Sequence, residues 1–188
     1  MKKSLFVLLL ALSNTLSAET IFQQDFETSL LGPNESVTGA FSVSNSSYLG
    51  NGTYVIGHES PYSPFESSAY ILSLDFTNVQ DAVLTFDYNI ETEACCDKFS
   101  ILSNGDVNDT LSGTMSGQLV VDLASLTGLE NVALTFRFVS DASIQRQGVI
   151  FDNILIDGTI SSVPVPAAFW LFSSGLLGLI GIARRKNA

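Results

Sequence analysis

Two nine-residue stretches alternate between apolar and polar side chains, and this alternation limits the chain to β structure. In AVLTFDYNI (82–90) every second residue from Leu84 is apolar, and in VALTFRFVS (132–140) every second residue from Val132 to Phe138 is apolar. Alternate side chains point to opposite faces of a strand, so each stretch predicts a strand with one buried and one solvated face. Between the chain's two end segments, no stretch sustains a helical period for three turns.

Seven further strand-like runs are separated by clusters of turn residues such as Gly50-Asn51-Gly52 and Asn104-Gly105-Asp106. Eight to ten short strands in about 140 residues favour two packed sheets. The predicted fold class is therefore all-β, a two-sheet antiparallel β-sandwich, most simply a jelly roll. The further runs are 21–26, 41–44, 54–57, 70–76, 98–103, 118–123 and 148–156.

The N-terminus, MKKSLFVLLLALSNTLSAET, has the layout of a secretory signal peptide. Two lysines precede an apolar stretch that is too short to span a bilayer comfortably, and small and polar residues follow it. We therefore expect an exported protein with a signal peptide over 1–18, cleaved after Ser17 or Ala18. The alternative is a retained N-terminal anchor. The predicted sandwich domain then covers 19–160.

The C-terminal segment 161–188 combines prolines, an apolar stretch and a basic tip. Residues 167–183 carry no charge, and 17 residues is the lower limit for a membrane-spanning helix. Prolines before the helix keep the chain extended, and basic residues after it favour the cytoplasmic side. The sequence predicts a transmembrane helix over 167–183, preceded by Val163, Pro164, Val165 and Pro166 and followed by Arg184, Arg185 and Lys186.

The segment VPVPAAFWLFSSGLLGLIGIARRK resembles the PEP-CTERM sorting signals of Gram-negative bacteria, in their VPxP variant. The three parts of such a signal occur here in order, although the usual glutamate of the motif is absent. The resemblance implies that the protein is anchored in the inner membrane until an exosortase-type enzyme removes its tail. It then reaches the cell envelope or the exopolysaccharide matrix. The alternative is a plain single-pass anchor.

The predicted domain is strongly acidic. It holds all 19 acidic residues and three basic ones, Lys98, Arg137 and Arg146, which gives it a net charge of −16. Such a charge repels nucleic acid and attracts divalent cations. We therefore expect no nucleic-acid partner.

A second resemblance spans most of the domain. The segments FQQDFET, LTFDYNIETEACCDKFSIL and VALTFRFVSDASIQRQGVIFDNILIDG together resemble jelly-roll adhesion and carbohydrate-binding-type domains, such as MAM-like modules. In those domains a late strand ending in Asp-Asp/Asn-Ile lies beside the first strand. The resemblance implies the same fold for this chain.

Calcium is the metal that these acidic residues fit best, because it prefers several oxygen ligands. Asp152 and Asn153 interrupt an apolar run, and a buried carboxylate needs a partner. An ion shared between the first and last strands supplies that partner; hydrogen bonds or a salt bridge to Arg137 or Arg146 are the alternative. Following the resemblance, the candidate ligands are Glu27 and Asp152 first, then Asp25, Asn153 and Asp97.

Cys95 and Cys96 are adjacent in the sequence. A disulfide is the default in an exported protein. Adjacent residues bridge only through a strained ring, because their Cα atoms lie closer together than in ordinary disulfides. We predict a vicinal disulfide at the tip of a loop; the alternatives are two free thiols or crosslinks to another chain.

The chain offers little for catalysis. Its one histidine, His58, lies in a run rich in Gly, Ser and Pro and is predicted to be a surface residue. Neither GxSxG nor HExxH is present. Carboxylate pairs suited to glycoside hydrolysis are too easily found among 19 acids to be informative. We expect no enzymatic activity, and a secreted hydrolase is the weakest hypothesis.

Aromatic residues cluster in SYLGNGTYVIGHESPYSPFESSAY. Exposed rings stack on sugars, so Tyr54, Tyr62 and Phe65 are candidate glycan contacts; alternatively the rings cover the open end of the sandwich. The sequence thus predicts a non-enzymatic surface or exopolysaccharide-matrix protein. A specific carbohydrate-binding module at the cell surface is the alternative.

Overall fold

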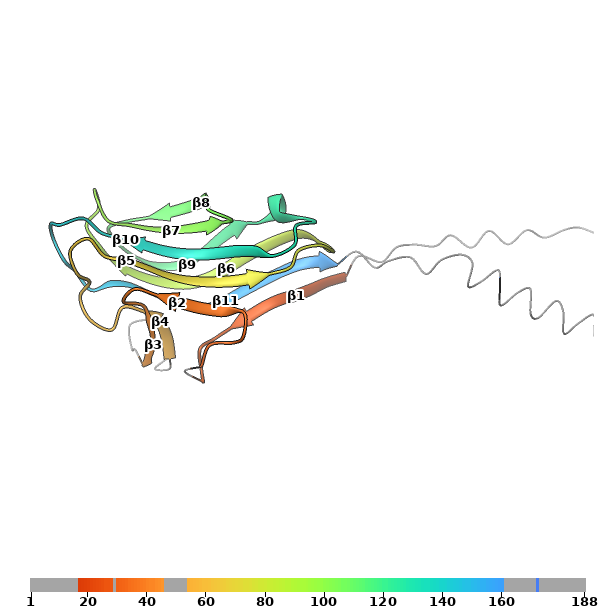
Figure 1. The fold of residues 1–188 in the computed structure, drawn as a ribbon, viewed down its shortest axis with the longest axis horizontal. Coiled ribbons are helices and arrows are strands. Elements are labelled where there is room, and N and C mark those ends of the chain that lie inside the picture. Colours follow the sequence, from red (N-terminus) through yellow and green to blue (C-terminus); the bar gives the residue numbers. More distant parts are fainter. Residues whose placement is uncertain (1–16, 29, 46–53, 161–171, 173–188) are drawn as a thin grey trace, which may run out of the picture. The chain divides into compact units, whose positions relative to one another are not determined.

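Two antiparallel sheets pack face to face in the computed structural model, which describes residues 17–28, 30–45, 54–160 and 172 (Figure 1). Sheet A has the strand order β3-β4-β11-β6-β9, with β1 also paired to β11, and sheet B has the order β2-β5-β10-β7-β8. The predicted antiparallel two-sheet sandwich is confirmed.

The strands of sheet A are β1 (Ser17–Gln24), β3 (Ser42–Asn45), β4 (Tyr54–Gly57), β6 (Val79–Glu91), β9 (Thr114–Asp122) and β11 (Gly148–Ile160). Those of sheet B are β2 (Glu35–Thr38), β5 (Ser67–Leu74), β7 (Lys98–Ser103), β8 (Asp106–Leu111) and β10 (Val132–Val139). A short 3-10 helix, η1 (Ala124–Leu126), follows β9.

The sandwich forms one compact unit, Ser17–Ile160. Ser17 and Ala18, which the sequence analysis assigned to the signal peptide, begin β1 and pair with Ile160 and Thr159. The rest of the predicted signal peptide and, apart from Phe172, the predicted sorting segment lie outside the described residues. Among the helices of the described residues, none is both long and apolar enough to cross a membrane.

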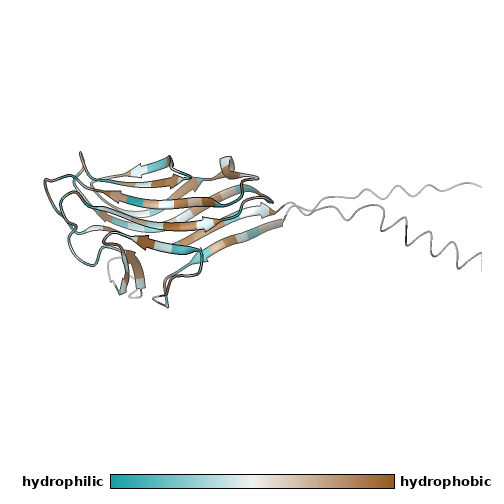
Figure 2. Ribbon diagram, viewed as in Figure 1, coloured by the Kyte–Doolittle hydropathy of each residue, from teal (hydrophilic) through white to brown (hydrophobic). Residues whose placement is uncertain are grey.

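The two alternating stretches form β6 and β10, one in each sheet. Along β10 the inward residues Val132, Leu134, Phe136 and Phe138 are fully buried while Arg137 is exposed. Hydropathy alternates along the strands in Figure 2. The inward rings meet between the sheets: Phe136 of β10 stacks parallel to Phe151 of β11, with centroids 5.1 Å apart. Phe86 of β6 packs edge-on against Phe136 at 5.2 Å. Alternation thus builds an aromatic core.

The first and last strands lie side by side, as the resemblance to MAM-like modules implied. Gln24 of β1 pairs with Ile154 of β11, and Ser17 pairs with Ile160 at one end of the sandwich (Figure 1). The pairing of β11 with β6 is interrupted between Asp152 and Leu155. Asn153 has a positive φ of 53° at this bulge. The polar pair Asp152-Asn153 therefore occupies an irregular point of the last strand.

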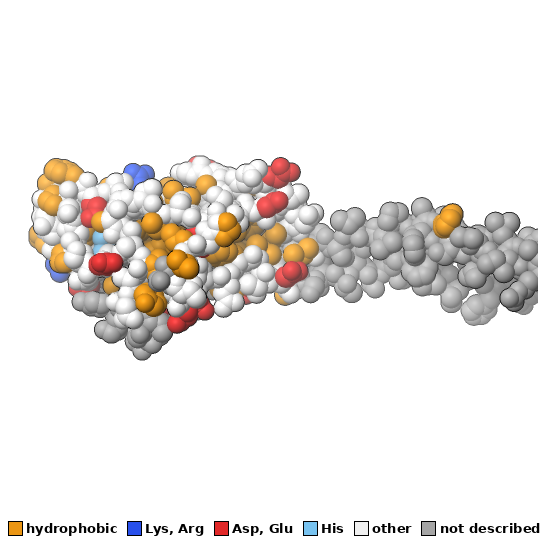
Figure 3. All heavy atoms as spheres, turned by 60° about the horizontal axis from the view of Figure 1, so that its bottom comes forward, with side chains coloured by type: hydrophobic (Ala, Val, Ile, Leu, Met, Phe, Trp, Pro, Cys, Tyr) orange, Lys and Arg blue, Asp and Glu red, His pale blue; other side chains and the backbone are white. Residues whose placement is uncertain are grey.

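The sequence analysis missed two edge strands, β2 and β8. The β8 residues are mostly polar, and exposed Val107 occupies an outward position, so no period of two is visible. In β2 the inward Val37 is only partly buried. Both of these edge strands are short. On the face of the sandwich shown in Figure 3, apolar side chains gather. Edge strands with little burial carry a weak sequence signal.

Replacing Phe136 with Ala should lower the free energy of unfolding by about 3–5 kcal/mol, because it removes a fully buried ring from the contact between the sheets. Urea unfolding of the purified chain measures the change. Val107→Ala on the exposed side of β8 is the control and should stay within about 0.5 kcal/mol of the wild type. Equal losses in the two variants would contradict the assigned core.

Candidate functional site at the loop end

Three loops meet at the end of the sandwich opposite Ser17 and Ile160, and we call them the loop end (Figure 1). They are the β4–β5 loop (58–66), the β6–β7 loop (92–97) and the β10–β11 loop (140–147). Backbone hydrogen bonds join the β4–β5 and β10–β11 loops: the Phe65 N–H donates to the Asp141 carbonyl at 2.8 Å, and the Ser140 N–H donates to the Glu66 carbonyl at 3.0 Å. The Asp141 N–H donates to the Asp97 carboxylate of the β6–β7 loop at 3.0 Å. The loops therefore support one another.

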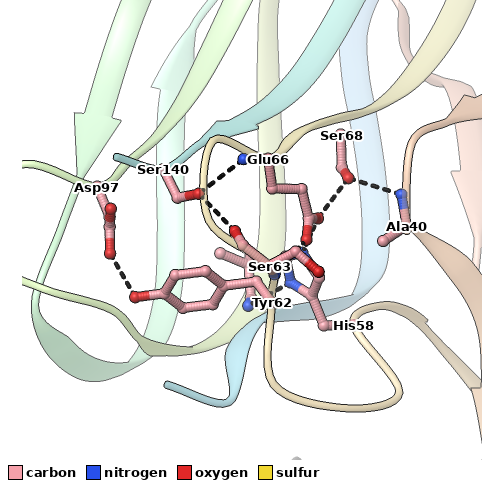
Figure 4. A network of polar contacts seen from close by, with 9 residues as sticks. Ala40, His58, Tyr62, Ser63, Glu66, Ser68, Asp97 and Ser140 are labelled. Atoms are coloured by element: carbon pink, nitrogen blue, oxygen red, sulfur yellow. Dashed lines mark hydrogen bonds and ion pairs between the residues drawn. The ribbon is translucent and has the colours of Figure 1, made fainter. Parts of the chain in front are cut away.

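His58 is buried beneath these loops, with 2% of its surface exposed, so the prediction of a surface histidine is wrong. Its Nδ1 accepts the Val149 N–H at 2.9 Å, and its Nε2 lies 2.6 Å from a Glu66 carboxylate oxygen (Figure 4). Since Nδ1 accepts, Nε2 carries the proton of the neutral ring and donates it to Glu66. The ring packs edge-on against Phe41 and Phe138, each 4.9 Å away.

Gly148, at the start of β11, is required by the position of His58. It has a φ of +99°, and a Cβ atom there would lie 2.3 Å from His58 Nδ1. A residue with a side chain would both strain the backbone and displace the imidazole. Glycine at 148 therefore lets the β11 backbone approach close enough to bond His58.

The Glu66 carboxylate is the hub of the buried network in Figure 4. Besides His58, it accepts the Ser68 hydroxyl at 2.6 Å and the Ser63 N–H at 2.9 Å. Burial alone would raise the pKa of Glu66, but these hydrogen bonds outweigh it and lower the pKa. The Ser140 hydroxyl accepts the Glu66 N–H and donates to the Ser63 carbonyl, each at 2.9 Å. Glu66 thus connects the β4–β5 loop, β5 and the β10–β11 loop.

Tyr62 is buried and has 3% of its surface exposed, so it is not available to stack on a sugar. Its hydroxyl hydrogen-bonds the carboxylate of Asp97 (Figure 4) and lies 2.8 Å from the Ile144 carbonyl. Burial and the Asp97 carboxylate raise the pKa of Tyr62. The alternative interpretation, that rings of this cluster cover the end of the sandwich, is correct for Tyr62. Tyr54 is partly buried and packs against the core.

Acidic side chains surround this buried pair. Ligand atoms of Glu93, Asp97 and Asp141 all lie within 4.8 Å of one another. The Asp97 carboxylate already accepts N–H groups from Glu93 at 3.1 Å and from Asp141 at 3.0 Å, so hydrogen bonds compensate for its burial. Hydrogen bonds from Ser143 lower the pKa of Asp141. These carboxylates are acceptors at the edge of the loop end.

Cys95 and Cys96 form a disulfide at the exposed tip of the β6–β7 loop. The loop is closed on both sides of it, because the Glu93 N–H bonds the Asp97 carboxylate and the Thr92 N–H bonds the Gly113 carbonyl at 2.9 Å. The disulfide therefore stiffens the segment between Glu93 and Asp97.

The predicted calcium ligands lie in two separate places. Asp25 and Asn153 line one pocket on the outer side of sheet A. Asp152 is fully buried nearby and accepts the Asn153 N–H at 2.7 Å, and the Glu27 N–H bonds Asp25 at 3.2 Å. Asp97 belongs to the loop end instead. Within the described ranges, no group of three His, Cys, Asp or Glu ligand atoms close enough to share an ion includes a residue of the β1–β11 set.

Phe65 is the exposed aromatic residue of the loop end, with 76% of its surface accessible. Its backbone has a positive φ of 56°, a region that a bulky residue rarely adopts. Phe26 also has a positive φ, of 51°, but it is fully buried against Tyr70, so core packing offsets the strain. Phe65 has no such compensation.

The polar network holds His58 in place. Both nitrogens of His58 are engaged, which leaves it no free lone pair to act as a general base. What the loop end presents outward is an aromatic ring, the exposed Ile144 and several carboxylates. The hub residues Glu66 and Ser140 were missed in the sequence analysis, because polar residues in a loop resemble solvated ones.

The free energy of unfolding should fall as the pH drops from about 7 to 5. Burial lowers the pKa of His58 below the ordinary 6.5 despite the opposing effect of Glu66. The unfolded chain therefore takes up a proton near pH 6.5 that the folded chain refuses, and stability is lost below that pH. Glu66 acts in a separate window, because its pKa is below 4.5 and its contribution is lost only at lower pH.

Urea unfolding at three pH values between about 7 and 5 measures this dependence. His58 is the only histidine of the chain, so His58→Gln should flatten the curve in this range while lowering its overall height. A wild-type curve that is level across the range, or one that rises toward acid, would rule out the buried neutral imidazole.

Comparison with known proteins gives the fold but no family. The chain matches no protein-family model and no curated protein. It is similar to a cleaved adhesin domain of Lys-gingipain from Porphyromonas gingivalis, at 9% identity and a TM-score of 0.50 over 75% of this chain and 99% of that one. It is also similar to TmCBM61, solved in complex with β-1,4-galactotriose, at 14% identity and a TM-score of 0.50 over 77% of this chain and 99% of that one. At these identities the likeness shows the fold alone.

Proposed function

We propose that the protein is a non-catalytic carbohydrate-binding domain and that the loop end is its binding site, centred on Phe65. The observation that carries this proposal is an exposed phenylalanine held in a strained backbone conformation. Positive φ costs a residue other than glycine roughly 1–2 kcal/mol. Strained residues of this kind cluster at ligand-binding and active sites.

The chemistry around Phe65 suits a sugar. A pyranose ring stacks its apolar face on an aromatic ring, and its hydroxyl groups need nearby acceptors. The carboxylates of Glu59, Glu93 and Asp141 supply acceptors on the three loops' outer side. The buried bonds of Glu66 and Asp97 hold the loops in place before any ligand arrives, which lowers the entropic cost of binding.

The fold is compatible with this ligand class. One similar structure was solved with β-1,4-galactotriose and the other is an adhesin domain, so the same sandwich serves recognition in other proteins. Fold alone does not assign a ligand, and the proposal therefore depends on the loop end itself.

Replacing Phe65 with Asn should weaken glycan binding by roughly tenfold or more while leaving the fold intact or more stable. The ring is lost, but Asn tolerates positive φ, so the free energy of unfolding should rise by about 1 kcal/mol. An array of neutral polysaccharides that includes β-1,4-galactan identifies the ligand. Isothermal titration with the best binder then compares the variants.

Phe65→Tyr, which keeps the ring, is the matched control and should bind as the wild type does. Two outcomes would contradict the proposal. One is the absence of saturable binding to any glycan on the array. The other is a Phe65→Asn variant that binds normally but unfolds more easily, since that result assigns the ring a structural role.

We further propose that the domain acts at the cell surface or in the exopolysaccharide matrix. The support is the sequence of the two chain ends, with a signal-peptide layout and a tail that resembles a PEP-CTERM signal. An exosortase-type enzyme is then the processing partner and surface polysaccharide the binding partner. The candidate cleavage motif is Val163, Pro164, Val165 and Pro166, with Arg184, Arg185 and Lys186 as the basic tip.

Intact mass spectrometry of the protein from culture medium and envelope fractions tests this sorting. We expect a species that lacks the signal peptide and everything beyond about Pro166. A membrane-bound species that retains Arg184 to Ala188 would exclude removal of the tail and would favour a plain anchor.

Calcium binding at the meeting point of β1 and β11 stays a prediction. Its support is that β1 pairs with β11 and that Asp25 and Asn153 line one pocket, with buried Asp152 next in sequence. Carboxylate and amide oxygens are suitable ligands for this ion.

A further inference from the structure

The two sheets present outer faces of opposite charge. In sheet B the inward positions are occupied by core residues such as Phe99 and Phe136, so the alternate residues face outward. These outward positions carry mainly small or hydroxyl-bearing side chains, for example Ser36, Ser67, Ser100 and Thr135. Their ionisable residues are Lys98 and Arg137, and none is acidic. We call this surface the basic face.

Sheet A shows the reverse pattern. Its outward positions on β6, β9 and β11 include Asp87, Glu91, Asp122 and Asp157, and these positions carry no basic residue. The separation is notable because acids outnumber bases 19 to 3 within the predicted domain. Outward positions without an acid on β2, β5, β7 and β10 of such a domain therefore need an explanation; Asp106 and Asp109 lie on the edge strand β8.

Lys98 and Arg137 are close neighbours on the basic face. Arg137 of β10 pairs with Ser100 of β7, and Val139 pairs with Lys98, so the two cations lie on a diagonal across adjacent strands. Diagonal neighbours have Cα atoms roughly 7–8 Å apart, within reach of each other's long side chains. Two like charges at this separation repel each other.

Neither cation is neutralised by the protein. The single ion pair recorded among the described residues joins His58 and Glu66. Lys98 and Arg137 are both exposed. With so many acids in the chain, a cation with a structural role would be paired with an acidic neighbour. An external anion explains both the unpaired cations and the missing acids.

We propose that the basic face binds an anionic polysaccharide, with sugar carboxylates held between Lys98 and Arg137. Arg and Lys donate charge-assisted hydrogen bonds to carboxylates. The hydroxyls of Ser100 and Thr110, 3.0 Å apart and next to these cations, can bond the sugar hydroxyls. The site is separate from the loop end and does not depend on the function proposed for Phe65.

The composition of the face argues against a protein partner. Protein interfaces are anchored by Tyr, Trp, Phe, Met and Arg, and of these only Arg137 is found at the outward positions of sheet B. A surface of hydroxyl-bearing and aliphatic side chains with two cations instead matches an extended, hydroxylated polyanion. Acids farther than the Debye length, about 8 Å at physiological salt, are largely screened from the two cations.

Binding of the full-length chain to polygalacturonate and to its fully methyl-esterified form tests the proposal, because esterification removes the charge and keeps the backbone. By biolayer interferometry at physiological salt, the wild type should prefer the free acid. The double variant Lys98→Gln, Arg137→Gln should bind the free acid roughly tenfold more weakly. Both residues are exposed, so the fold should be unaffected.

Arg146→Gln is the matched control, since it removes the same charge from an exposed residue outside sheet B. It should bind as the wild type does. Equal binding of the acid and the ester, or equal losses in the double variant and Arg146→Gln, would overturn the proposal. Sedimentation velocity tests whether a second copy of the chain binds this face instead. Self-association of the wild type that the double variant abolishes, together with no binding of polygalacturonate, would assign the face to a second copy and overturn the proposal.

Discussion

The structure depends on contact between aromatic rings of the two sheets. Phe136 of sheet B stacks on Phe151 of sheet A, and Phe86 packs edge-on against both. Each sheet alone would expose one apolar face, so neither sheet is stable without the other. Because the core fixes where β10 ends and where β11 begins, it also determines both ends of the loop between them. The position of every residue at the loop end follows from this packing.

At the loop end, polar bonds replace apolar packing. The Glu66 carboxylate receives donors from His58 and Ser63 of the β4–β5 loop and from Ser68 of β5. Asp97 receives donors from all three loops. A buried carboxylate whose hydrogen bonds are satisfied can hold loops rigidly, whereas one that loses a donor is destabilising. The strained Phe65 backbone rests on this support through its bond to Asp141. A recognition surface requires exposed side chains on a rigid support.

Alternation was enough to predict the sandwich, and β4 and β7 were predicted to the residue, because both have buried residues bounded by clear turn signals. It failed for β2 and β8, where little side-chain surface is buried. The burial of His58 was out of reach, since it depends on Val149, which is 91 residues away in the sequence. The hydrogen bond between Tyr62 and Asp97 was out of reach for the same reason, because 35 residues separate them in the sequence. Local composition describes a loop's own residues but not the distant segments that cover them.

The path of β11 gives the domain a mechanical property. This strand runs from the β10–β11 loop, at the loop end, to Ile160 at the opposite end, and it is paired with β6 along one side and β1 along part of the other. Tension between a ligand at the loops and the C-terminal end of β11 therefore acts along the strand. Antiparallel hydrogen bonds lie perpendicular to that direction, so they are loaded in shear and share the force. A sandwich connected in this way suits a component that must hold while it is pulled.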